Sequence, residues 1–92
     1  MKFQIKNEFA PNITEIDISE KELFYIGMLM SGVKLSQALE LLSMSISDLH
    51  IFYNKLGLSN SKRIKHMQAI TLFVMNNIVS DNNLLDIYKK YN

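Results

Sequence analysis

The sequence contains no cysteine and no tryptophan, and only one proline among its 92 residues. Without cysteine the chain forms no disulfide and no thiolate-ligated zinc site, and thiol catalysis is excluded. The absence also fits a reducing compartment. The formal net charge of +1 is close to zero, whereas domains that bind nucleic acid strongly are usually basic. The overall charge therefore gives no support to nucleic-acid binding, and only its distribution along the chain is informative.

Long apolar runs are also missing from this sequence. No stretch approaches the roughly 20 apolar residues that a membrane span requires, and residues 1–11 lack the apolar region of a secretory signal. We therefore expect a cytoplasmic protein without membrane contact. Hydrophobic residues make up 48% of the chain, which predicts one domain with a small core. Oligomerisation would be a useful supplement to the stability of such a domain.

The residue patterns that mark most enzyme sites are absent as well. There is no phosphate-binding glycine loop and no nucleophile elbow in the sequence. The two histidines, His50 and His66, are too far apart to form a zinc site in a chain without cysteine. We therefore do not expect an enzyme, and we expect no catalytic residue, no metal site and no cofactor.

Two hydrophobic periodicities divide the chain. Polar and apolar residues alternate at 2–6 and 15–18, with Pro11 between them, which predicts either an extended arm or a hairpin. From residue 18 onwards the period is that of helices, which are predicted at 19–31, 36–42, 46–56, 62–79 and 84–91. The predicted fold is all-α, a small helix-turn-helix bundle of four to five helices with a short extended or hairpin N-terminal arm. The expected division is an arm at 1–17, a helix-turn-helix domain at 18–80 and a C-terminal helical extension at 81–92.

Capping residues define several ends of these helices. Ser19 followed by Glu22 is a capping box, and Ser45 followed by Asp48 is the cap of a later helix. Gly32 is a helix stop, because glycine adopts the left-handed conformation at little cost. The few residues between the second and third predicted helices then form the turn of a helix-turn-helix.

The third predicted helix, at 46–56, carries polar side chains on the face opposite its apolar stripe. In a helix-turn-helix protein this face meets base edges in the major groove. The basic residues between 55 and 66 have no acid among them, and such residues hold phosphates. Ordinary solvation of these polar groups is the alternative. The candidate base-contacting residues are Ser47, His50, Ile51 and Asn54. The candidate phosphate-contacting residues are Lys55, Lys62, Arg63 and Lys65.

The fourth predicted helix, at 62–79, is apolar nearly all round. A small domain cannot cover so much apolar area with one core, so the excess is a candidate dimer surface. The alternative is burial under the N-terminal arm or the last helix. The residues predicted at a homodimer interface are Ile70, Phe73, Val74, Asn77 and Ile78.

From residue 18 to residue 49 the chain resembles, without a gap, the LuxR/GerE-type helix-turn-helix. The matching positions are Ile18, Ser19 and Glu22 at the start, Gly32 after the first helix, Leu42-Ser43-Met44-Ser45 in the turn, Asp48-Leu49 in the recognition helix, and then Lys55-Leu56-Gly57. The predicted recognition helix is about one turn shorter than in that family, and Ser43 stands where the family has glycine. From Met44 onwards the chain also resembles, less extensively, an AraC-type subdomain. Both resemblances imply a transcription-regulatory module.

On these grounds we expect a small DNA-binding transcriptional regulator whose partner is double-stranded DNA. The LuxR/GerE resemblance implies a homodimer on an inverted-repeat site. The alternative is a protein-interaction module, a co-regulator or anti-activator, on a degenerate helix-turn-helix scaffold. Such a module would bind another regulator or RNA polymerase through its exposed apolar residues.

Overall fold

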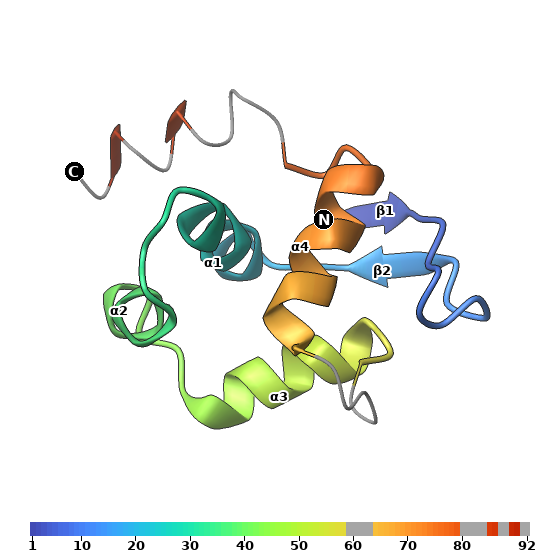
Figure 1. Ribbon diagram of the computed structural model, residues 1–92, viewed down its shortest axis with the longest axis horizontal. Helices are drawn as coiled ribbons and strands as arrows, with labels where there is room; N and C mark the ends of the chain where they lie inside the picture. Colours follow the sequence, from blue (N-terminus) through green and yellow to red (C-terminus); the bar gives the residue numbers. More distant parts are fainter. Residues whose placement is uncertain (59–63, 80–84, 87–88, 91–92) are drawn as a thin grey trace.

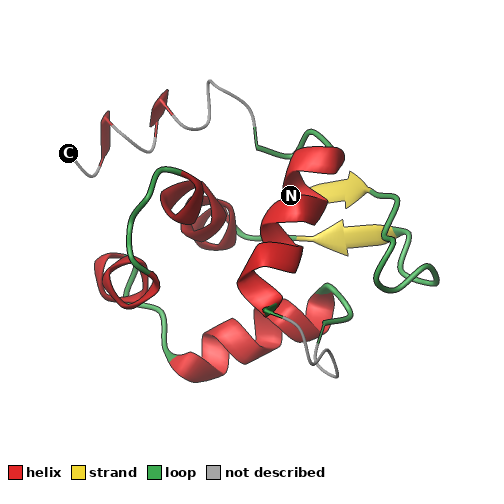
Figure 2. Cartoon of the chain, in the orientation of Figure 1, coloured by secondary structure: helices red, strands yellow, loops and turns green. Residues whose placement is uncertain are grey.

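The computed structural model describes residues 1–58, 64–79, 85–86 and 89–90 of the chain. A two-stranded hairpin precedes the helices, and the helices surround one core (Figures 1 and 2). In order along the chain the elements are β1 (Lys2–Gln4), β2 (Glu15–Asp17), α1 (Glu20–Met30), α2 (Leu35–Leu41), α3 (Ile46–Lys55) and α4 (Lys65–Met75). In Figure 1, α4 crosses the middle of the view, with the hairpin on one side and α1 and α2 on the other.

The first 17 residues form a hairpin rather than a loose arm. Its strands are antiparallel, and Phe3 lies opposite Ile16 in the register. A hairpin of two short strands is only marginally stable by itself, so it needs the helices beneath it. Ile5 and Ile16 supply that support, because both side chains are buried in the same core as the helical residues. The prediction of a small helical bundle is therefore confirmed, and of the two alternatives predicted for the N-terminal arm the hairpin is the one present. The class all-α is too narrow for a chain that contains this sheet.

The predicted cap of α1 is confirmed in detail. The backbone amide of Glu22 donates to the Ser19 hydroxyl over 3.1 Å, and the Glu22 carboxylate accepts from the amide of Ser19 over 2.8 Å. These two bonds satisfy two of the backbone donors that a helix start leaves unpaired. The helix ends at Met30, and Gly32 follows with a φ of 90°. Local sequence therefore fixes both ends of α1.

The fourth helix is shorter than its sequence predicts. The prediction of a helix through residue 79 is wrong, because α4 ends at Met75 and Asn77 adopts a left-handed φ of 54°. The Asn76 amide nitrogen donates to the carbonyls of Leu72 and Lys6, and its oxygen accepts from the amide of Lys6 over 2.9 Å. Asn76 thus ends the helix and attaches it to the chain just after β1. Residues 62 and 63, and residues 84, 87, 88 and 91 of the final helix predicted at 84–91, lie outside the described residues.

Aromatic rings from three helices meet at the centre of the core. Phe52 of α3 is fully buried and makes edge-to-face contacts with Tyr25 of α1 and with Phe73 of α4, at centroid distances of 6.0 and 5.8 Å. Such edge-to-face pairs add to the stabilisation that the rings gain from burial alone. The Phe52 side chain therefore packs α3 against both α1 and α4.

A hydrogen bond between two buried tyrosines crosses the same core. The hydroxyl oxygens of Tyr25 and Tyr53 are 2.9 Å apart. Burial raises the pKa of the Tyr53 phenol, and burial together with the bond to Tyr53 raises that of Tyr25 well above its usual 10.0. The folded state thus favours the neutral phenols. Their contribution to the free energy of unfolding is fully present below about pH 10 and is lost as the pH rises beyond it.

We accordingly expect the protein to lose stability above about pH 10, where ionised tyrosine is favoured in the unfolded chain. Of the four tyrosines in the sequence, Tyr25 and Tyr53 are expected to ionise only as the helices melt. Tyrosinate absorbance and circular dichroism, recorded in one alkaline titration, measure both events. A double Tyr25→Phe, Tyr53→Phe variant controls for the lysines that titrate nearby. Ionisation of all the tyrosines with the helical signal intact would contradict the buried pair.

The loop between the strands is attached to the end of α3. The buried Asn7 side chain donates to the carbonyl of Leu56 over 2.9 Å and accepts from the amides of Phe9 and Ala10. Gly57 follows α3 with a φ of 76°, and a Cβ atom there would lie only 2.5 Å from the Cβ of Ala10. Gly57 is therefore required both by the backbone conformation and by the close approach of the loop.

Two glycine substitutions separate those requirements. Gly32→Ala meets only the cost of the left-handed backbone, about 1–2 kcal/mol, because nothing lies within 4 Å of its added Cβ. Gly57→Ala has the same backbone cost, and the overlap with Ala10 adds about 1–3 kcal/mol more. Urea unfolding of both variants measures the difference. Equal losses of unfolding free energy would mean that the loop moves away freely.

Candidate nucleic-acid interface

A tight turn joins α2 to α3. Ser43 adopts a left-handed φ of 53°, and the amide of Met44 donates to the carbonyl of Leu39 over 2.9 Å. Ala38 and Leu42 are buried and hold this part of the chain on the core. Figure 1 shows α2 nearly end-on while α3 runs across the view, so the two axes cross steeply. α2 and α3 therefore meet at a steep angle across a short turn.

The start of α3 carries the second predicted cap, which is confirmed. The Ser45 hydroxyl accepts from the amide of Asp48 over 3.0 Å, and the Asp48 carboxylate accepts from the amide of Ser45 over 2.9 Å. The backbone amide of Ser45, and secondly its side chain, hold the pKa of the Asp48 carboxyl below its usual value of 3.8. This carboxylate is therefore negatively charged at neutral pH and lies at the helix start, where it repels a phosphate.

The outer face of α3 brings together the four predicted base-contacting residues. Positions i, i+3, i+4 and i+7 share one side of a helix, and all four of these side chains are exposed. The opposite side of α3 is buried through Leu49, Phe52 and Tyr53. The four residues of this outer face are Ser47, His50, Ile51 and Asn54. α3 therefore presents these four side chains together to solvent.

Lys55 has a different partner from the phosphate that the sequence suggested. Its ammonium group lies 2.8 Å from one carboxylate oxygen of Glu22 and 3.1 Å from the other. The Glu22 side chain is nearly buried and also caps α1. Lys55 thus joins the end of α3 to the start of α1, and a phosphate would have to compete with this ion pair.

Of the other three predicted phosphate-contacting residues, only Lys65 is among the described residues. Lys62 and Arg63 lie outside the described residues, and Lys65 is a half-buried residue at the start of α4. The outer face of α3 is therefore the part of the predicted DNA contact that the described chain brings together.

Two of the five predicted dimer residues require correction. Phe73 and Ile78 are buried inside this chain, Phe73 against Phe52, and a buried side chain is not available to a second copy. Ile70 is half-buried, while Val74 and Asn77 are exposed. On this helix and the residue before it, the apolar side chains of Ile64, Met67 and Val74 face solvent. The buried side of α4 consists instead of Gln68, Ala69, Leu72 and Phe73.

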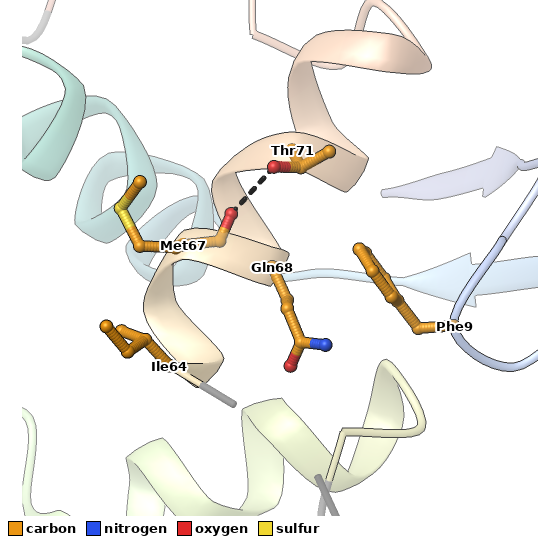
Figure 3. A pocket seen from close by; sticks show the side chains of 5 residues that line it. All are labelled: Phe9, Ile64, Met67, Gln68 and Thr71. Atoms are coloured by element: carbon orange, nitrogen blue, oxygen red, sulfur yellow. Dashed lines mark hydrogen bonds between the residues drawn. The ribbon is translucent and has the colours of Figure 1, made fainter. Parts of the chain in front are cut away.

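An open hollow of about 660 Å³ adjoins this exposed side of α4. Figure 3 shows Phe9 approaching it from the β1–β2 loop, while the other side chains come from α4 or the residue before it. Met67 and Ile64 expose more than half of their surface, and Phe9 exposes 40%. The residues that line the hollow are Phe9, Ile64, Met67, Gln68 and Thr71. Apolar side chains gathered around a depression form a surface suited to contact with another protein.

Metal-binding clusters and membrane-spanning helices have no counterpart among the described residues. Among residues 1–58, 64–79, 85–86 and 89–90, no three His, Asp or Glu side chains lie close enough together to hold a metal ion. Within those same ranges, every helix is too short or too polar to cross a membrane. No protein-family model, no curated protein and no solved structure matches the chain.

Proposed function

We propose that this chain is a small transcriptional regulator that binds double-stranded DNA by inserting α3 into the major groove. One observation carries the proposal: a capped helix follows a tight turn and presents Ser47, His50, Ile51 and Asn54 to solvent on a single face. The 10 residues of α3 span about 15 Å. An α-helix is about 10–12 Å across with its side chains, which suits insertion into a major groove about 12 Å wide.

Charge predicts how strongly such a complex depends on salt. The net charge is only +1, and Asp48 adds a negative charge beside the outer face of α3. Few phosphates are then neutralised, so the affinity is modest and falls as salt displaces the contacts that do form. Positive charge would come from Lys65 at the start of α4. Lys62 and Arg63, which precede α4 in the sequence, would add to it.

The proposal is tested by titrating labelled duplexes with the full chain and following fluorescence anisotropy. A random-sequence duplex pool is used first, since no operator has to be known, and repeated enrichment then selects the preferred sequences. The expected result is binding at low salt that weakens steadily as salt is added, with enrichment of a common motif. A flat titration at low salt, where phosphate contacts are strongest, rules the proposal out.

The exposed side of α4 favours a second function, contact with another protein, and we propose a second copy of this chain as that protein. Residues 67–80 contain no charged side chain, so identical faces meet without like-charge repulsion. In a two-fold dimer each copy would place Met67 against the hollow of its partner. The pair would then present two α3 helices to an inverted-repeat site. A different regulator or RNA polymerase would be the occupant if the chain proves monomeric.

We expect Met67→Glu to convert a dimer to monomers, because it places a carboxylate on the apolar surface that the two copies share. Light scattering over a range of concentrations measures the mass directly. Leu41→Glu is the matched control, since Leu41 is also exposed but lies on α2, and it should leave the mass unchanged. A wild-type chain that stays monomeric at every concentration overturns the dimer.

A further inference from the structure

Two isoleucines on α3 lie outside the hydrophobic core. Ile46 and Ile51 expose 61% and 60% of their surface. Isoleucine is a poorer helix former than alanine, because its branched side chain loses freedom against the preceding turn. Neither helix propensity nor core packing therefore accounts for an isoleucine at position 51, in the middle of the outer face.

The outer face of α3 also lacks the side chains that read guanine. Arginine or lysine, paired with the O6 and N7 atoms of guanine, makes the commonest specific contact in the major groove. Between Ile46 and Lys55, which are described throughout, there is no arginine. The one lysine in the helix is Lys55, whose ammonium group is bound to Glu22. The face therefore offers little to a G·C base pair.

The same face suits A·T base pairs. The methyl group of thymine is the apolar group that base edges show in the major groove, and an asparagine amide pairs with N6 and N7 of adenine. Ile51 and Asn54 are three residues apart on one side of α3, which is a rise of about 4.5 Å. Successive bases along one strand are about 3.4 Å apart. The two side chains are thus spaced to reach neighbouring base pairs.

We propose that α3 recognises adjacent A·T base pairs, with Ile51 packed on a thymine methyl group and Asn54 paired with an adenine. The inference rests on the proposed function, since it assigns the class of duplex that the same face binds. The contact between the Ile51 side chain and one thymine methyl group then accounts for part of the affinity.

The test replaces thymine with uracil, which removes the methyl group and keeps the base pair. Duplexes enriched from the random pool are synthesised in both forms and titrated with the full chain. We expect the uracil duplex to bind about fourfold more weakly for each methyl group in contact. Ile51→Ala should weaken binding to the thymine duplex and bind both duplexes equally well. Leu41→Ala, another exposed apolar residue but on α2, should keep the wild-type preference for thymine.

The outcomes distinguish the two proposals. If the wild-type chain binds both duplexes equally well, methyl recognition is overturned while duplex binding stands. If Ile51→Ala retains the full preference for thymine, the assignment to Ile51 is overturned. If the wild-type chain binds neither duplex, the proposed function falls and the inference falls with it. Matching circular dichroism spectra and thermal midpoints for the variants exclude loss of folding as the cause.

Discussion

Phe52→Ala is expected to lower the free energy of unfolding by about 3–5 kcal/mol, the usual cost of emptying a fully buried phenylalanine site. The Phe52 ring has no exposed surface and touches Tyr25 and Phe73, so its loss separates α3 from both α1 and α4. A domain of this kind is stable by only about 5–15 kcal/mol in total. The variant should therefore unfold at a much lower urea concentration, measured by circular dichroism.

The neighbouring residue supplies the matched control for this experiment. Ile51 lies on the same helix but is 60% exposed. Ile51→Ala should change the free energy of unfolding by no more than about 0.5 kcal/mol, as is usual for a surface substitution. Similar stability losses in the two variants would show that α3 is not oriented as described.

A double His50→Ala, Asn54→Ala variant is expected to bind duplex DNA about 100-fold more weakly than the wild-type chain. Each well-placed base contact contributes about 1–3 kcal/mol, and both side chains lie on the exposed outer face of α3. Since neither residue is buried, the fold should be unaffected. Anisotropy titrations on the enriched duplex measure the affinity, and thermal melting checks the fold.

The control for the double variant is Asn12→Ala, a polar truncation in the exposed β1–β2 loop. It should bind DNA as the wild-type chain does. Wild-type affinity in the double variant would separate DNA binding from α3, and the contact would have to lie elsewhere on the chain.

The helices around the turn could be predicted because their signals are local. Ser19 with Glu22, and Ser45 with Asp48, are three residues apart, and each pair forms the reciprocal bonds that the spacing predicts. Gly32 likewise adopts the left-handed conformation expected of a helix stop. A helix end depends on its immediate neighbours, so the sequence contains what is needed to locate it.

The orientation of α4 could not be predicted from periodicity, because two apolar stripes compete on one helix. The stripe through Met67 and Val74 has the correct period, yet it faces solvent. The stripe with Ala69, Leu72 and Phe73 is buried. Phe73 carries the larger apolar side chain, and a small residue beside it permits close packing. Side-chain volume, which periodicity leaves out, distinguishes the buried side from the exposed one.

Long-range contacts account for the other differences. Lys55 and Glu22 are 33 positions apart in the sequence, and nothing near either residue indicates that they pair. The same is true of Asn76, which ends α4 and forms hydrogen bonds with Lys6, 70 positions away in the sequence. Two successive asparagines after an apolar run were an available sign of a helix end, since asparagine tolerates the left-handed conformation that Asn77 adopts.

The central claim is that the outer face of α3 is the surface that meets DNA, and NMR spectroscopy tests it most directly. Backbone and side-chain amide signals of the isotope-labelled chain are recorded while an unlabelled duplex is added. We predict that the largest shift changes fall on α3, at Ser47, His50, Ile51 and Asn54, with smaller changes near Lys65. Shift changes centred on Met67 and the exposed side of α4, or no change at saturating duplex, would contradict the account.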